Sequence, residues 1–335
     1  MNVRRLIPTA AVAGAVALGL TALSACSSSD AAEGGDAGGN GGKLDVVASF
    51  YPMQFLAERI GGSHVSVTSL TKPGVEPHDL ELSPQQIGGL SDADYILFLK
   101  NIQPAVDDAV AQAGVKNTVD AAGLTTLESH GAEVDGHDHG SEEHAGEEHA
   151  DEHEGEEHAD EAALDPHVWL DPVKYAEVAE GVGKSLEKAD PDNAADYRKN
   201  TETLVAELNK LDKTFEAGLK NTATKTFITT HSAFGYLAER YGLTQEGIAG
   251  LDPETEPSPA RIDEIHHVAE ENKATTVFFE TLASDKTAKT LAKDLGLKTG
   301  VLDPLEGITD KSAGADYIEV MESNLAALQK ALGAK

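Results

Sequence analysis

The chain has 335 residues, enough for two ordinary lobes built around separate hydrophobic cores. Asp and Glu total 58 against 26 Lys and Arg, which excludes a nucleic-acid-binding surface, because replacing phosphate counterions requires Lys and Arg. The single cysteine, Cys26, excludes both a disulfide framework and a zinc site built from thiolates. Any metal site in this chain must therefore use His and carboxylate ligands.

The N-terminal residues predict a targeting segment. Arg4 and Arg5 precede an apolar stretch from Ala10 to Leu23, and small residues then lead to Cys26. This arrangement resembles the lipobox of bacterial lipoproteins, in which the signal is cleaved and the cysteine is lipidated. We therefore expect residues 1–25 to be a lipoprotein signal peptide, with Cys26 anchoring the protein at the extracytoplasmic face of the cell membrane. The alternative is an ordinary secretory signal with a chance cysteine.

Residues 26–43 predict a flexible tether, because they are mostly Ser, Gly, Ala, Asp and Asn and can bury no core. Strands and helices then alternate from residue 44, which is typical of βαβ units and a mainly parallel sheet. The predicted strands cover residues 44–49, 64–70 and 95–99, and the predicted helices cover 52–60, 83–90 and 104–113. We assign residues 44–190 to an N-terminal lobe.

The composition changes in residues 128–162, which we interpret as a disordered loop inserted into this lobe. The segment is rich in Asp, Glu and His, contains no Lys or Arg, and has few apolar side chains to bury. Its imidazoles predict a secondary, weak metal-binding loop formed by His137, His139, His144, His149, His153 and His158. The alternative is a solvating spacer that happens to be rich in histidine.

A helix is predicted over residues 172–189, and a longer one connects the lobes over residues 191–219. In the longer helix, apolar residues recur at spacings of three, four and seven and form one stripe: Tyr197, Leu204, Leu208, Leu211 and Phe215. Residues 220–335 form the predicted C-terminal lobe. Its strands are expected at 226–230, 277–279 and 298–302, and its helices at 233–241, 259–272, 285–295 and 316–332. The predicted fold is α/β, with two βα lobes, mainly parallel sheets and a long rigid helix between them.

Four residues are candidates for a metal site in a cleft between the lobes. His78, His231 and Asp303 each follow a predicted strand, and ligands of parallel α/β sheets bind beyond the carboxyl ends of strands. His167 lies in a loop bracketed by Pro166 and Pro172. Three imidazoles and one carboxylate suit four-coordinate Zn²⁺, whereas Mn²⁺ prefers more oxygen ligands.

The fourth ligand stays open at this point. Glu76 and Glu280 also lie near predicted strand ends, and either residue, or water, is an alternative to Asp303. A single histidine after a strand is also commonly structural or simply exposed.

Four segments resemble the bacterial zinc/manganese solute-binding lipoproteins. They are Pro73–His78, Asp165–Pro172, His231–Leu237 and Leu302–Leu305, and the second match is the most specific. The resemblance covers roughly residues 44–332, apart from the acidic loop.

The resemblance implies a binding protein, not an enzyme, that holds one metal between its lobes and hands it to an ABC permease. His231 favours zinc, because manganese members typically carry Glu at this position. We expect a monomer that contacts the membrane through its lipid anchor. The alternatives are a manganese-binding member of the same family, a zinc-buffering surface adhesin and a zinc hydrolase; the last lacks a His-Glu-x-x-His helix in this sequence.

Overall fold

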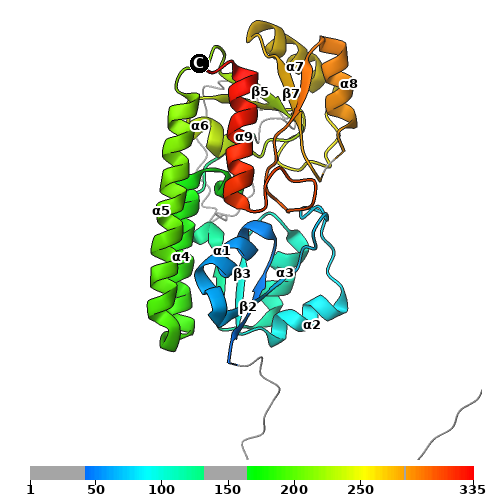
Figure 1. The fold of residues 1–335 in the computed structure, drawn as a ribbon. Helices are drawn as coiled ribbons and strands as arrows, with labels where there is room; N and C mark the ends of the chain where they lie inside the picture. Colours follow the sequence, from blue (N-terminus) through cyan, green and yellow to red (C-terminus); the bar gives the residue numbers. More distant parts are fainter. Residues whose placement is uncertain (1–41, 132–163, 283) are drawn as a thin grey trace, which may run out of the picture. The chain divides into compact units, whose positions relative to one another are not determined.

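The computed structural model describes residues 42–131, 164–282 and 284–335 (Figure 1). The predicted signal peptide, Cys26 and the six histidines from His137 to His158 lie outside these residues. Every helix in the described part is too short or too polar to cross a membrane.

The first sheet has four parallel strands in the order β2-β1-β3-β4. The strands are β1 (Leu44–Ala48), β2 (Val65–Ser69), β3 (Tyr95–Phe98) and β4 (Thr118–Asp120). The helices of this lobe are α1 (Tyr51–Gly61), α2 (Pro84–Asp92) and α3 (Pro104–Ala113), with short 3-10 turns at η1 (Gly62–His64) and η2 (Ala121–Leu124). The predicted elements are confirmed, and the sequence missed only the short strand β4.

The second sheet is also parallel, in the order β6-β5-β7-β8, so the two sheets share one topology. The strands are β5 (Thr226–Thr229), β6 (Thr244–Gly247), β7 (Thr276–Phe279) and β8 (Lys298–Val301). The helices are α6 (Gly235–Arg240), α7 (Pro259–Glu271), α8 (Lys286–Leu295) and α9 (Tyr317–Leu332). The strand order of each sheet reverses between two neighbouring strands, which are β1 and β3 in the first sheet and β5 and β7 in the second. In parallel α/β sheets, ligands bind in loops at the carboxyl ends of the strands beside such a reversal.

Capping residues fix where several helices begin. Ser83 forms a capping box with Gln86 at the start of α2, and Ser258 accepts a hydrogen bond from Arg261 N at the start of α7. Asp171 caps α4 (Pro172–Ala189), and a proline stands in the first turn of all three helices. The start of α4 therefore directly follows the predicted ligand loop that carries His167.

Helix α5 (Ala194–Leu219) has 26 residues, so it is roughly 39 Å long at 1.5 Å per residue. It follows the short turn η6 (Pro191–Asn193), and Figure 1 shows it lying beside α4 and α9. All five residues of the predicted apolar stripe are buried. The long helix is thus confirmed, and one face of it packs along its whole length.

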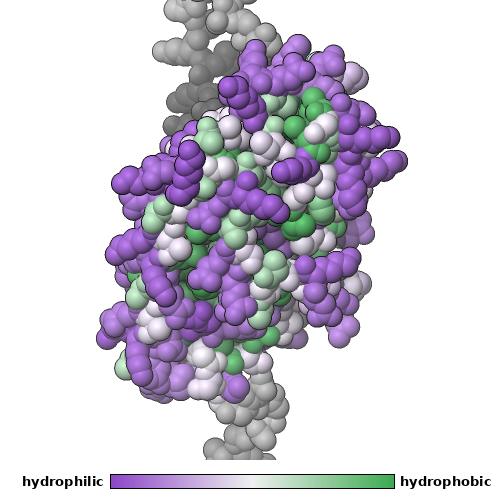
Figure 2. Space-filling model, turned by 45° about the horizontal axis from the view of Figure 1, so that its top comes forward, coloured by the Kyte–Doolittle hydropathy of each residue, from purple (hydrophilic) through white to green (hydrophobic). Residues whose placement is uncertain are grey.

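One continuous cluster of buried side chains extends through both lobes and α5. Phe55 of α1 packs against Tyr317 of α9, with ring centroids 5.4 Å apart. Trp169 donates from Nε1 to Pro304 O at 2.7 Å, and Tyr317 donates from its hydroxyl to Trp169 O at 2.6 Å. Figure 2 shows a face on which hydrophilic residues cover most of the surface. The apolar side chains are thus concentrated in a core that fixes the lobes against each other.

Candidate metal centre

Three of the four predicted ligands meet, and a residue that the sequence did not single out completes the group. His78, His167, His231 and Glu306 each place one ligand atom within 4.8 Å of the others. The Nε2 atoms lie 3.3 Å (His78), 3.4 Å (His167) and 3.3 Å (His231) from the same oxygen, Glu306 Oε1. We call these four residues the buried cluster.

Strand ends and tight loops bring the buried cluster together. His78 lies in the loop between β2 and α2, and His231 follows β5. His167 stands directly before the 3-10 turn η5 (Val168–Leu170), and Glu306 lies in the loop between β8 and α9. The first sheet's lobe thus contributes two imidazoles, and the second sheet's lobe contributes one imidazole and one carboxylate.

Asp303 is not part of the buried cluster, contrary to the expectation from the sequence. Its Oδ1 accepts a hydrogen bond from Leu305 N at 2.9 Å, and its Oδ2 accepts one from Thr281 Oγ1 at 3.1 Å. Leu305 is buried with a φ of 60°, an unusual backbone conformation for a non-glycine residue. Asp303 therefore shapes the turn, and the turn brings Glu306 to the imidazoles.

The other two acidic candidates also lie outside the buried cluster. Glu280 Oε1 is 2.6 Å from His231 Nδ1 and also accepts a hydrogen bond from Thr230 Oγ1. Glu76 Oε1 accepts a hydrogen bond from His78 N at 3.3 Å. Burial, and next the nearby charge of Glu306, raise the pKa of Glu76 to about 9. Glu280 thus orients a candidate ligand, and Glu76 is protonated near neutral pH.

A second carboxylate orients His167. Asp165 is fully buried, and its Oδ1 lies 2.8 Å from His167 Nδ1 and accepts from His167 N at 2.9 Å. A metal-binding imidazole characteristically donates its other ring N–H to a carboxylate, which fixes the tautomer and the orientation of the ring. Asp165 and Glu280 do this for His167 and His231, so both Nε2 lone pairs face Glu306.

The charges inside the buried cluster are strongly coupled. Burial alone raises the pKa of Glu306, but the imidazoles around it, led by His231, hold this pKa well below its usual range. Burial alone lowers the pKa of His231, but Glu280 and Glu306 outweigh it and raise this pKa well above its usual value. The pKa of His167 is raised against burial by Asp165 and Glu306. Protons and a metal ion therefore compete for the same imidazole nitrogens.

Several polar atoms in the cluster lack a satisfactory partner. His167 Nε2, His231 Nε2 and Glu306 Oε2 are buried and make no hydrogen bond of good geometry within the described residues. Buried polar atoms nearly always have a hydrogen-bond partner. Three buried atoms without one, all in the same cluster, therefore indicate a place for a bound ion. The donor set of three imidazoles and one carboxylate is the one that Zn²⁺ accepts in tetrahedral geometry.

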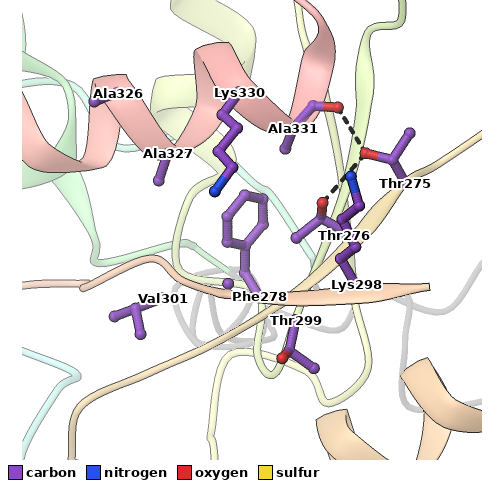
Figure 3. Close-up of a pocket in the computed structure, with 11 residues that line it drawn as sticks. Thr275, Thr276, Phe278, Lys298, Thr299, Val301, Ala326, Ala327, Lys330 and Ala331 are labelled. Carbon is purple, nitrogen blue, oxygen red and sulfur yellow. Dashed lines mark hydrogen bonds between the residues drawn. The ribbon is translucent and has the colours of Figure 1, made fainter.

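A separate cavity of about 350 Å³ has no comparable chemistry (Figure 3). It lies between β7, β8 and α9, and its polar side chains include Lys298 and Lys330 together with threonines. The two lysines make this cavity unsuitable for a cation, because it presents positive charge and no carboxylate or imidazole.

Comparison with known proteins identifies the family. A family model described as the zinc-uptake complex component A, periplasmic, matches residues 46–331. The chain belongs to this family. It is 38% identical over 304 residues to the high-affinity zinc uptake system protein ZnuA of Bacillus subtilis, covering 89% of this chain and 90% of that protein.

Longer relatives match over part of their length. The chain is 38% identical over 296 residues to the zinc-binding lipoprotein AdcA of Streptococcus pneumoniae, which covers 86% of this chain and 56% of AdcA. The chain therefore spans about half the length of that relative. The crystal structure of Zn(II)-bound AdcA superposes with a TM-score of 0.69 at 34% identity, covering 87% of this chain and 58% of that one.

Proposed function

We propose that this protein captures Zn²⁺ outside the cytoplasm and delivers it to an ABC permease. The observation that carries the proposal is the convergence of three buried imidazole nitrogens on Glu306 Oε1. The relatives named as zinc-binding and zinc-uptake proteins support the same cargo. The site is closed by four protein ligands, as in a binding site, whereas a catalytic zinc keeps one position open for water.

The ligand set favours zinc over manganese. Mn²⁺ prefers carboxylate, carbonyl and water oxygens, and the buried cluster supplies one carboxylate against three imidazoles. A manganese-binding role remains the alternative within this family. Because a given set of nitrogen and oxygen ligands binds Zn²⁺ more tightly than Mn²⁺, affinity alone does not separate the two roles; loss of zinc uptake, or of manganese uptake, in cells that lack the protein does.

Replacing His78 and His231 together by alanine tests the site. We expect the double variant to lose tight one-to-one zinc binding in calorimetry. The matched control replaces His266 and His267, two imidazoles on α7 outside the cluster, and should retain it. Tight stoichiometric zinc binding by the double variant H78A/H231A would show that the cargo site lies elsewhere.

Anchoring at the membrane is proposed from Cys26 and the residues before it. The Cys26→Ser variant should lose incorporation of labelled fatty acid and leave the membrane fraction, while its zinc affinity stays unchanged. Fatty-acid labelling of the variant would show that another residue is acylated. We also propose that the released protein is a monomer, which sedimentation at several concentrations tests.

Residues 128–162, here called the acidic segment, are proposed to bind zinc weakly and so raise the zinc concentration near the cleft. Deleting residues 133–160 should remove weak zinc equivalents and leave the tight one. The matched control keeps the length of the segment and replaces its six histidines by Gln. If neither change alters the zinc stoichiometry, the segment is a spacer.

We propose that the lobes, residues 44–190 and 220–335, move little when zinc binds, because residues 191–219 and the shared core brace them. Small-angle scattering of the metal-free and zinc-loaded protein should give nearly equal radii of gyration. A large compaction on loading would show a wide hinge closure instead.

A further inference from the structure

A second group of potential ligands lies where the acidic segment leaves the fold. Glu128, His130 and Glu239 each place one ligand atom within 4.8 Å of the others. We call these three residues the surface cluster. Glu128 and His130 were expected to belong to a disordered loop, but both contact the second lobe. His130 Nε2 lies 2.8 Å from Glu239 Oε2 of α6.

The imidazole of the surface cluster is held in the same way as a ligand of the buried cluster. His130 Nδ1 lies 3.2 Å from Asp165 Oδ2, while the other oxygen of Asp165 holds His167 Nδ1. One buried carboxylate thus orients two imidazoles. With Nδ1–H donated to Asp165, His130 presents Nε2 to Glu239, which is the orientation that a metal ligand requires.

Packing against Tyr236 holds two parts of the surface cluster, the ring of His130 and the backbone of Glu128. The His130 ring lies edge-on to Tyr236, with centroids 4.5 Å apart. The Tyr236 hydroxyl donates to Asp165 O at 2.7 Å and accepts from Glu128 N at 2.8 Å. Because Tyr236 contacts all three of these residues, the backbone at Glu128 and the ring of His130 are held before any ion arrives.

We infer that Glu128, His130 and Glu239 form a second, weaker binding site for a divalent cation. Imidazole nitrogens and carboxylate oxygens both bind Zn²⁺, and with three protein ligands one position stays open for water. On binding, the metal takes the Nε2 lone pair of His130 and releases the proton that Nε2 shares with Glu239. That the ion is Zn²⁺ rests on the proposed function.

Three differences make the surface cluster weaker than the buried cluster. It has three ligands, against four in the buried cluster. The Glu239 side chain is 61% exposed, so water competes for the ion. Lys174 Nζ lies 2.6 Å from Glu128 Oε1 and opposes a second positive charge. A site that binds an ion less tightly than the buried cluster can pass that ion onward to it.

The position of the surface cluster gives it a role in transfer. Gly131 and Leu164 flank the histidine-rich segment in sequence, and Asp165 N donates to Glu128 O at 2.8 Å, so both ends of the segment meet at this place. The surface cluster therefore lies at the point where both ends of the segment join the fold. At the surface cluster, His130 shares the carboxylate of Asp165 with His167 of the buried cluster.

Anomalous diffraction at the zinc edge, on crystals of the full chain in excess zinc, tests the inference. We expect one peak at the buried cluster and a second between His130 Nε2 and Glu239. In the double variant H130Q/E239Q the second peak should disappear and the first remain. The matched control, His64→Gln, removes a surface imidazole paired with Asp196 at 2.9 Å and should keep both peaks.

Calorimetry in solution completes the test. In the protein with one zinc already bound, H130Q/E239Q should weaken the next equivalent at least tenfold relative to the His64→Gln control. Absence of the second peak, or a second peak that survives H130Q/E239Q, overturns the inference. Absence of the first peak instead contradicts the proposed function, so the two failures are distinguishable.

Discussion

His130 and His167 share the carboxylate of Asp165 but stand in opposite surroundings. His167 is fully buried and faces two further imidazoles and Glu306, whereas His130 is partly exposed and faces two glutamates and a lysine. The same orienting group thus serves one closed and one open set of ligands. Burial and the number of ligands, and not the orienting carboxylate, therefore distinguish the buried cluster from the surface cluster.

The largest effect is expected from Glu306→Gln, which removes the only carboxylate of the buried cluster. Zinc affinity should fall by more than about 100-fold, beyond the roughly 10–100-fold typical of losing a group outside the coordination sphere. Competition against a chromophoric chelator measures the change.

The matched control is Asp303→Asn, two positions past the end of β8 (Lys298–Val301) and in the same loop as Glu306. Asn keeps the oxygen that accepts from Leu305 N, so the turn persists and zinc affinity should stay close to that of the natural chain. If Asp303→Asn were the more damaging change, Asp303 and not Glu306 would be the ligand.

The next effect concerns the orienting carboxylates. Asp165→Asn and Glu280→Gln should each weaken zinc binding by about 10–100-fold, because each frees the ring of one ligating imidazole. The two variants distinguish the clusters, because Asp165 contacts a histidine of each cluster whereas Glu280 contacts His231 of the buried cluster. Calorimetry should show loss at the second equivalent for Asp165→Asn alone; an equal loss for Glu280→Gln would mean that the clusters are linked by another route.

The pH dependence follows from the shifted pKa values of His167 and His231. Both are raised by neighbouring carboxylates, so protons compete with zinc up to a higher pH than for a free imidazole. Zinc affinity should therefore fall as pH is lowered, by about tenfold per pH unit for each proton released. Glu306 stays ionised, because its pKa is lowered.

Competition titrations between about pH 6 and pH 8 measure this slope. In Asp165→Asn one of the two carboxylates that raise the pKa of His167 is gone, so the decline should move to lower pH. A flat profile in the natural chain would mean that the imidazoles are unprotonated before zinc binds.

The smallest effect is expected at the buried cluster when the surface cluster is changed. His130→Gln removes a hydrogen bond to Asp165 Oδ2 but leaves the bond from Oδ1 to His167. The zinc affinity of the buried cluster should change by less than about tenfold. That is smaller than the roughly 10–100-fold loss of affinity that follows when a group supporting a metal ligand is removed. A larger loss, seen by the same chelator competition, would make His130 part of the support of the tight site.

The spacing of apolar residues, together with the residues that end helices and strands, was enough to predict most of the fold. The apolar stripe of α5 and the alternation of strands and helices determine which faces are buried, so both predictions are confirmed. β4 and β6 were missed because they are short edge strands without a continuous apolar run. Edge strands depend on pairing with a neighbour more than on their own composition.

The fourth member of the buried cluster was missed for a different reason. Strand-end position favoured Asp303, the first polar residue after β8. The backbone at Leu305 turns into the left-handed region, and this reverses which side chain faces the imidazoles. Local sequence gives no sign of such a turn at leucine, because the buried surroundings of Leu305 stabilise it.

The hydrogen bond from Trp169 to Pro304 has a consequence for the order in which ligands exchange. It ties the segment that carries His167 to the segment that carries Glu306, so these two ligands separate only if the bond breaks. His231 is fully enclosed, whereas the His78 side chain is 10% exposed and stands on a loop whose neighbours Pro73 and Gly74 face solvent. We therefore expect the dissociation rate of a bound ion to follow the motion of this one loop, without any opening of the molecule.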